Sequence, residues 1–306
     1  MDDLAALYRF LAQGYLRPPN DDFLAAASAV PELEPHLKTN LSDAYTWLFE
    51  FNVYPYASVY LDPSGMLNAP WSGFVAGVYR ALGLEVAADA GLAASDHLSA
   101  GLGAVASLLE REAAATDELT RTRARHAQRT LLVEQLLPWL PTFSAAVREL
   151  DAGFYGVLTE MTLSLSLEHA AELQAETARP FTYPKEETEV GAGAKEQLTR
   201  FMTPARSGMF LSRETVVRLG RRLGVPVRFA ERAYMLEQLA LAAADAEKLD
   251  RFFLELKREA EEQTAALNSL QKTWPSLAPL WTAAVDKLER AAAELQQLSE
   301  DVTPVG

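Results

Sequence analysis

Residues 4–16 read LAALYRFLAQGYL, and this stretch sets the pattern for most of the chain. Its large apolar side chains recur at intervals of three and four residues, which is the repeat of a helix with one buried face. They are Leu4, Leu7, Tyr8, Leu11 and Tyr15. Pro18 and Pro19 follow, and proline ends such a helix because it has no backbone N–H. The stretch therefore predicts an amphipathic helix.

The same spacing continues through the first part of the chain. Asn20 offers an N-cap side chain for a second short helix, and Ser95-Asp96 is expected to cap a helix that begins near Leu98. Further helices are predicted over residues 43–51, 71–82, 131–150 and 154–176. No sustained strand pattern is present, so the fold class predicted is all-α, with a compact helical bundle over residues 1–178.

The second part of the chain differs in composition. Residues 179–195 hold prolines, glycines and glutamates and are predicted to be a linker. Residues 196–306 are predicted to form a smaller helical extension. Its long amphipathic runs, at 230–270 and 279–298, are separated by Trp274-Pro275 and therefore predict a helical hairpin.

The bulk composition excludes several classes of site. The chain has 306 residues, of which 49% are hydrophobic and 23% charged, so it can bury a large core. It has no cysteine, which excludes disulfides, thiolate nucleophiles and cysteine-held metals. Its four histidines are far apart in the sequence. We therefore expect no metal site, no cofactor and no catalytic residues.

Charge and hydropathy indicate where the protein acts and what it contacts. The first residues include two acids and no basic leader, and no apolar run approaches the ~20 residues that cross a bilayer, so a cytoplasmic location is expected. The net charge is −14, and residues 1–100 hold twelve acidic against four basic residues. This favours a cationic partner over nucleic acid, although acidic surfaces also serve solubility alone.

Three short motifs carry the functional prediction. Residues 54–62 read YPYASVYLD, residues 95–98 read SDHL, and residues 135–143 read QLLPWLPTF. In this order and at these separations they resemble the TorD-like family of redox-enzyme maturation chaperones, which includes DmsD-like and NarJ-like branches. The resemblance covers roughly residues 1–178.

The resemblance rests on individual positions. The family elements Pro-x-x-Ser-x-Tyr, Asp-His-Leu and Leu-x-x-Trp-x-Pro-x-Phe are matched by Pro55, Ser58 and Tyr60, by Asp96, His97 and Leu98, and by Leu136, Trp139, Pro141 and Phe143. Two positions depart from the family. Small residues at Ala93 and Ala94 replace a Glu-Pro pair, and Gln135 replaces a histidine.

The resemblance implies a non-enzymatic function. Family members bind the apo form of a molybdopterin oxidoreductase catalytic subunit, of the DMSO reductase or nitrate reductase type. They often do so through its twin-arginine signal peptide, and they hold the subunit for molybdenum cofactor insertion. Some members form homodimers by exchanging halves. No membrane insertion and no catalysis are implied.

A signal peptide has a cationic end followed by an apolar helix, so its receptor needs aromatic pockets beside carboxylates. We predict that the following residues bind the client or its signal peptide: Tyr54, Pro55, Ser58, Tyr60, Asp62, Asp96, His97, Trp139 and Pro141. Tyr56 and Trp71 could add pocket walls. The alternative for each is structural: prolines that shape turns, aromatic rings in the core, a capping aspartate and a packed histidine.

A second functional hypothesis concerns residues 203–229. This region holds six arginines against a single acidic residue, Glu214, and a helix start at Ser212 is followed by a turn at Gly224. The pattern is compatible with a helix-turn-helix, so a regulatory protein that binds DNA is the alternative. The pattern is also common in helical bundles, and we expect these arginines instead to contact the acidic linker, the first part of the chain or an acidic face of the client.

Overall fold

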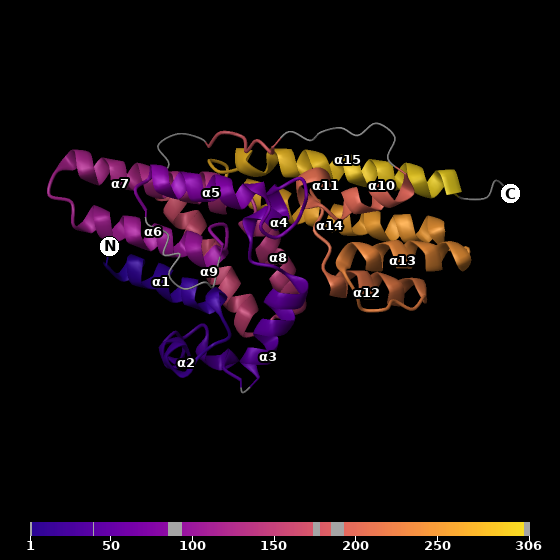
Figure 1. Cartoon of the computed structure of the whole chain (residues 1–306), viewed down its shortest axis with the longest axis horizontal. Helices are drawn as coiled ribbons and strands as arrows, with labels where there is room; N and C mark the ends of the chain where they lie inside the picture. Colours follow the sequence, from indigo (N-terminus) through magenta and orange to yellow (C-terminus); the bar gives the residue numbers. More distant parts are fainter. Residues whose placement is uncertain (1, 39, 85–93, 174–177, 185–192, 303–306) are drawn as a thin grey trace.

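The computed structural model describes residues 2–38, 40–84, 94–173, 178–184 and 193–302 (Figure 1). These residues form helices joined by turns, and within the described ranges there is no β-strand. The closest approach to one is an isolated antiparallel bridge between Tyr56 and His97. The prediction of an all-α fold is confirmed.

The elements up to Leu173 are α1 (Asp2–Leu16), α2 (Asp21–Ser28), the 3-10 turn η1 (Glu34–His36), α3 (Leu41–Tyr45), the π-helical turn η2 (Thr46–Asn52), α4 (Ala57–Leu61), α5 (Pro70–Ala81), α6 (Leu98–Ala113), α7 (Glu118–Thr130), the π-helical turn η4 (Leu131–Leu136), α8 (Leu140–Leu150) and α9 (Phe154–Leu173). The predicted helix over 154–176 extends past α9 into residues 174–177, which lie outside the described part of the chain.

Helix α1 buries the apolar face that its sequence predicts. Tyr8, Leu11 and Tyr15 lie on one face and are fully buried. The hydroxyl groups of the two tyrosines contact α9, with Tyr8 Oη 3.0 Å from His169 Nδ1 and Tyr15 Oη 2.8 Å from Thr162 Oγ1. These contacts meet the hydrogen-bonding needs of the buried hydroxyls. Helix α1 is therefore fixed against the long central helix α9.

Two predicted helices are interrupted by π-helical turns. The predicted helix over 43–51 is divided into α3 and η2, and the one over 131–150 into η4 and α8. Pro138 explains the second break, because it cannot donate a backbone hydrogen bond and its ring clashes with the preceding turn. The amide of Leu137 instead donates to the carbonyl of Leu132 at 2.8 Å. Helix α8 then restarts with Pro141 in its first turn.

The elements beyond residue 193 are α10 (Ala194–Phe201), α11 (Pro204–Ser207), α12 (Arg213–Leu223), α13 (Arg232–Asp245), α14 (Leu249–Thr273) and α15 (Pro279–Val302). Helices α14 and α15 lie side by side and are joined by a short turn at 274–278, so the predicted hairpin is confirmed (Figure 1). The predicted run over 230–270 is broken at Glu247, whose φ of 56° no helix accommodates.

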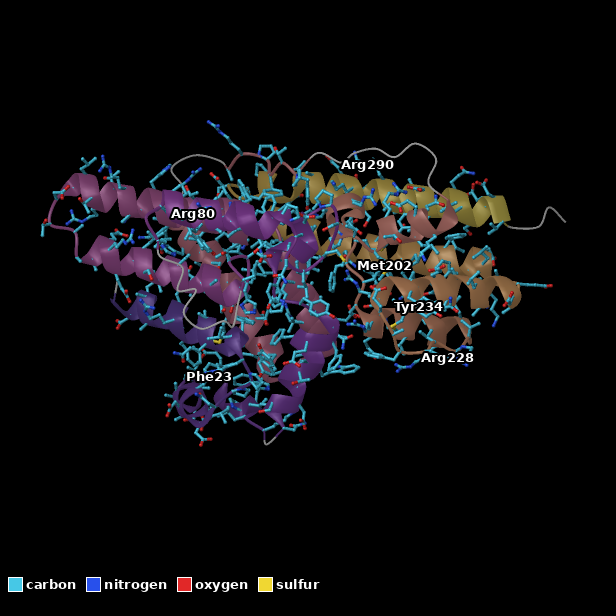
Figure 2. All side chains as sticks on the ribbon, viewed as in Figure 1. Phe23, Arg80, Met202, Arg228, Tyr234 and Arg290 are labelled. Atoms are coloured by element: carbon cyan, nitrogen blue, oxygen red, sulfur yellow. The ribbon has the colours of Figure 1, made fainter. Side chains whose placement is uncertain are left out.

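Side chains fill the space between the helices (Figure 2), and buried apolar residues from both regions belong to one hydrophobic core. Trp281 of α15 is fully buried, and its indole Nε1 donates to the carbonyl of Leu137 at 2.7 Å. Phe210, between α11 and α12, stacks on Tyr60 of α4 with ring centroids 5.1 Å apart. The division into a domain at 1–178, a linker at 179–195 and an extension at 196–306 stays a prediction, and residues 185–192 of that linker lie outside the described residues.

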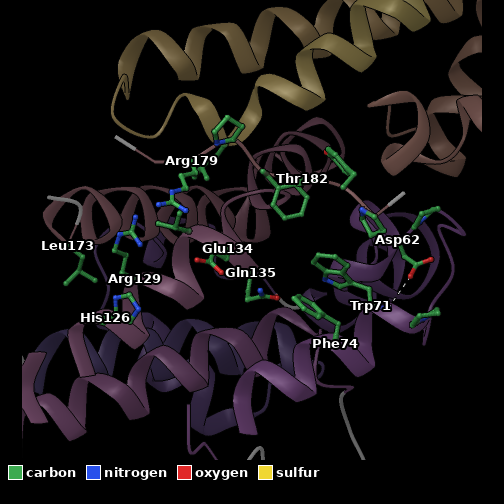
Figure 3. Close-up of a pocket in the computed structure, with 18 of the residues that line it drawn as sticks. Asp62, Trp71, Phe74, His126, Arg129, Glu134, Gln135, Leu173, Arg179 and Thr182 are labelled. Atoms are coloured by element: carbon green, nitrogen blue, oxygen red, sulfur yellow. Dashed lines mark hydrogen bonds between the residues drawn. The ribbon is translucent and has the colours of Figure 1, made fainter. Parts of the chain in front are cut away.

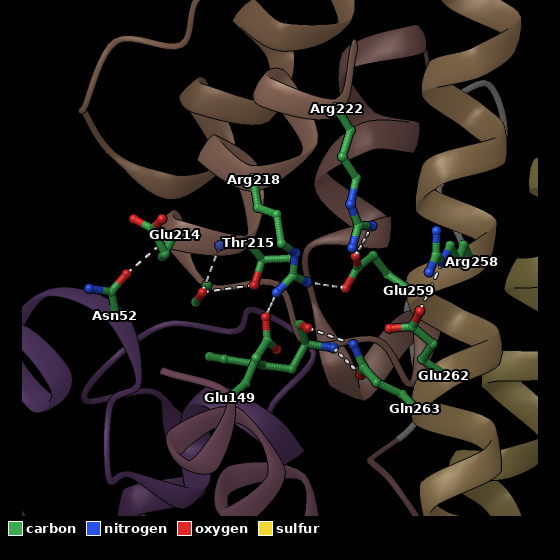
Figure 4. A network of polar contacts seen from close by, with 12 residues as sticks. Asn52, Glu149, Glu214, Thr215, Arg218, Arg222, Arg258, Glu259, Glu262 and Gln263 are labelled. Atoms are coloured by element: carbon green, nitrogen blue, oxygen red, sulfur yellow. Dashed lines mark hydrogen bonds and ion pairs between the residues drawn. The ribbon is translucent and has the colours of Figure 1, made fainter. Parts of the chain in front are cut away.

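An ion-pair network also crosses between the two regions (Figure 4). Arg218 of α12 pairs with Glu149 of α8 and, at 2.7 Å, with Glu259 of α14. Arg222 pairs with the same Glu259 at 3.1 Å, and only 4% of the Glu259 side chain is exposed. A buried carboxylate needs such partners because desolvation disfavours its charge.

The arginine-rich region therefore faces the protein's own carboxylates. Arg206 pairs with Glu196, and Arg221 pairs with Glu214. In addition, residues 224–231 separate α12 from α13, whereas a helix-turn-helix has a turn of about 3–4 residues. The DNA-binding alternative is not favoured, and the hypothesis of contacts within the chain agrees with these pairs.

Candidate functional site

The first two motifs fold against each other. The amide of Leu98 donates to the carbonyl of Pro55 at 2.8 Å, and the amide of Ala57 donates to the carbonyl of Asp96 at 2.9 Å. The side chain of Asp96 accepts a further bond, from the amide of Ser58 at 2.9 Å. Asp96 therefore satisfies the free amides at the start of α4, a helix from a distant part of the sequence.

The predicted N-cap role of Ser95-Asp96 at α6 is wrong. The N-cap of α6 is His97, whose Nδ1 accepts from the amide of Ser99 at 3.1 Å. Asp96 lies one residue too early, and its carboxylate is turned towards Ser58. A cap supplied across the fold leaves no local sequence pattern, which is why spacing alone assigned it to α6.

The third motif packs on the first through aromatic rings. Tyr60 stacks on Trp139 with centroids 5.1 Å apart and an interplanar angle of 24°. The indole of Trp139 donates to the carbonyl of Gln135 at 2.8 Å. Both rings are at most 2% exposed, and Pro141 is buried at the start of α8. These residues hold the centre of the fold together.

Most predicted site residues are therefore buried. Pro55, Ser58, Asp96 and His97 lie at the contact of the first two motifs. Tyr54 is half-buried, and its hydroxyl accepts from Arg213 Nη1 at 2.8 Å. The structure brings the motifs together but presents few of their side chains to a partner, and their role in client binding stays a prediction.

Burial controls the charge of the histidines in this part of the fold. It lowers the pKa of His97 to about 4, against the opposing effect of Asp96, and also lowers the pKa of His169 to about 4. Both imidazoles are therefore neutral at pH 7. His169 Nδ1 lies 3.0 Å from Tyr8 Oη, and its Nε2 lies 3.1 Å from Gln128 Oε1.

The stability of the fold should consequently fall in mild acid. Below pH 6.5 the unfolded chain binds a proton at each of these histidines, while the folded protein does not until the pH nears 4. We expect each to reduce the free energy of unfolding by about 2 kcal/mol between pH 7.5 and 5.0. Urea unfolding at these two pH values should show that the free energy of unfolding falls less for the His169→Gln variant than for the native chain. An identical loss in both would contradict this account.

A large open groove lies beside the first motif (Figure 3). Its volume is about 1850 Å³, and its walls come from α5, from α7 with η4, and from the segment 178–184. Of the predicted site residues, Asp62 lines it. The Asp62 carboxylate accepts from the amide of Trp71 at 3.1 Å and from the Ser64 hydroxyl at 2.6 Å, which fixes the start of α5 and the tryptophan against the groove.

One end of the groove is aromatic. Trp71 and Phe74 of α5 lie in contact at 5.0 Å, and Phe181 faces Trp71 at 6.0 Å (Figure 3). Phe74 is 53% exposed and so presents an apolar ring to solvent at this end of the groove. Of these three rings, the sequence motifs indicate Trp71 as a pocket wall but give no such indication for Phe74 and Phe181. The spacing of Trp71 and Phe74, three residues apart on a helix, was the available indication.

The other end of the groove carries charge of both signs. Arg125, His126 and Arg129 of α7 line it, together with Glu118 and Glu134. Arg125 also pairs with the buried Glu112 at 3.1 Å. A partner bound along the groove would therefore meet apolar rings at one end and ionic groups at the other.

The described residues contain no group of three histidine or acidic side chains placed to hold a metal ion. None of the helices in the described ranges is both long and apolar enough to span a membrane.

Comparisons with known proteins agree with the motifs. Residues 15–145 match the family model described as nitrate reductase delta subunit. The chain is 28% identical over 142 residues to the chaperone protein TorD of Aliivibrio fischeri strain ES114, covering 46% of this chain and 66% of that protein. It is 26% identical over 156 residues to the chaperone protein TorD of Vibrio vulnificus strain YJ016, covering 50% and 72%.

The matched region contains all three motifs. Over this region the chain is similar to the TorD-like maturation chaperones. The match spans about two thirds of the length of the first relative. Residues 196–306 lie beyond the matched family region.

Proposed function

We propose that this protein is a cytoplasmic chaperone for a redox enzyme that carries molybdopterin. It binds the apo catalytic subunit, of the DMSO reductase or nitrate reductase type, and holds it until the molybdenum cofactor is inserted. The segment bound includes the twin-arginine signal peptide of the client. Binding and release, without catalysis by the chaperone, perform this function.

The observation that carries the proposal is the groove of about 1850 Å³ beside the family motif. Trp71 and Phe74 offer an apolar surface, and burial of apolar area is the main favourable term in such associations. Glu134 is an exposed carboxylate farther along the groove that suits a cationic segment, whereas Glu118 beside it pairs with Arg121 at 2.7 Å. The net charge of −14 adds long-range attraction for a basic peptide.

Phe74→Asp tests the groove, because this half-exposed ring can be replaced without opening the core. We expect the dissociation constant for the apo catalytic subunit to rise at least about tenfold, which corresponds to the loss of one well-placed aromatic contact. Leu241→Asp is the matched control, since Leu241 on α13 is 54% exposed and lies outside the groove. Calorimetric titration of both variants measures the difference.

The pair of variants separates binding from folding. Circular dichroism and the urea midpoint should be the same for both variants and close to those of the native chain. Equal affinity of the Phe74→Asp and Leu241→Asp variants for the client would remove the groove from the proposed function.

A further inference from the structure

A segment of the chain itself already lies along the aromatic end of the groove. Residues 178–184 read ARPFTYP, and none of them belongs to a helix or strand. Pro180 and Pro184 disfavour both helix and strand pairing. In the described part of the chain, the segment is held by one backbone hydrogen bond, from the amide of Ala178 to the carbonyl of Ser276 at 2.8 Å.

Aromatic contacts hold the rest of the segment. Phe181 meets Trp71 edge to face at 6.0 Å, and it contacts Tyr183 at 5.1 Å. The ammonium group of Lys287 lies 4.3 Å from the centre of the Tyr183 ring. Thr182, between the two rings, is exposed, whereas Phe181 and Tyr183 on either side of it are partly buried. The segment therefore presents alternate side chains to the protein.

The groove holds polar atoms that this segment does not satisfy. Trp71 Nε1 and Gln135 Oε1 are buried and have no hydrogen-bond partner among the described residues. Both residues line the groove, and Figure 3 shows Gln135 lying between Glu134 and the rings of Trp71 and Phe74. One atom is a donor and the other an acceptor, which are the two groups that the main chain of an extended peptide complements.

We propose that residues 178–184 are a built-in competitor for the aromatic end of the groove. The partner they stand in for is an extended peptide segment with an aromatic side chain close to a basic one, as in Arg179-Pro180-Phe181. The partner peptide displaces residues 178–184 from the groove and forms hydrogen bonds with Trp71 and Gln135. The inference rests on the proposed function for the identity of the partner, but the competition itself is a property of this chain.

The competition can be measured without a client. The full chain with Phe181→Ser and Tyr183→Ser is compared with the native chain, and the probe is a synthetic peptide of sequence ARPFTYP. Ligand-observed saturation-transfer NMR should show at least about fivefold more transfer to the peptide's phenylalanine ring with the double variant, because its groove is vacated. Equal transfer to both proteins, or none to either, would overturn the proposal.

A fluorescent label checks where the segment lies in the native chain. The protein has no cysteine, so Phe181→Cys takes a bimane label at the one position of the segment that meets Trp71. Bimane is quenched by contact with tryptophan, so its emission should rise when Trp71→Phe is added. Unchanged emission would show that the segment does not rest on Trp71.

The peptide result is independent of client binding. Peptide binding to the double variant combined with no client binding to any variant would reject the proposed function and retain the competitor. Client binding that depends on Phe74, combined with no peptide binding, would retain the proposed function and reject the competitor.

Discussion

Trp281→Ala should destabilise the whole protein, by about 3–5 kcal/mol in the free energy of unfolding. The indole is completely buried, so its removal leaves a large cavity between the two regions of the chain. It also leaves the carbonyl of Leu137 without the donor that it has at 2.7 Å. Because folded domains are stable by only about 5–15 kcal/mol, this loss would be a large fraction of the total.

Urea unfolding followed by far-ultraviolet circular dichroism measures this effect. Trp281→Phe is the control, because it keeps most of the ring volume and loses the N–H donor, at a cost of about 1–3 kcal/mol. We expect one transition that shifts as a whole, since one buried core contains residues from both regions. Two separate transitions, with the first part unaffected, would instead support independent domains at 1–178 and 196–306.

Tyr60→Ala should have an effect of similar size, about 3–5 kcal/mol. Its ring is 2% exposed and lies between Trp139 and Phe210, each with centroids 5.1 Å from it. Truncation would remove both stacking contacts at the point where the family motifs and the extension meet. Urea midpoints of the native and variant chains measure the loss.

Tyr60→Phe is the matched control, and it should change stability little or increase it slightly. Among the described residues the Tyr60 hydroxyl has no hydrogen-bond partner, and burial raises its pKa. Removing an unsatisfied buried polar group costs nothing, whereas removing the ring opens a cavity. A large loss in Tyr60→Phe would mean that the hydroxyl has a partner, such as a bound water.

The sequence predicted elements well where apolar side chains recur at helical spacing. Helix α1 and the α14–α15 hairpin are such cases. Helix α7 (Glu118–Thr130) was missed because its sequence, ELTRTRARHAQRT, is mostly polar and its buried positions are small residues such as Ala124 and Ala127. Periodicity detects large apolar side chains, so a charged helix of this kind gives little indication.

The motifs located the right region, but they could not show which side chains are open. Tyr60 and Trp139 fit an aromatic pocket as well as they fit a core, and only tertiary packing separates the two. The groove itself is formed by Trp71 and Phe74 together with Phe181, which is more than a hundred residues away. No local pattern joins such distant positions, so the sequence alone indicates binding residues within the motifs and not in the groove.

The central claim is most directly tested by what the tagged chain retains from the cytosol of its own organism. Mass spectrometry should identify the catalytic subunit of a molybdopterin oxidoreductase, and metal analysis should find that subunit without molybdenum. The Leu241→Asp variant should retain the subunit, and the Phe74→Asp variant should lose most of it. Absence of any such subunit from the native chain, or its presence with molybdenum already inserted, would contradict the chaperone function.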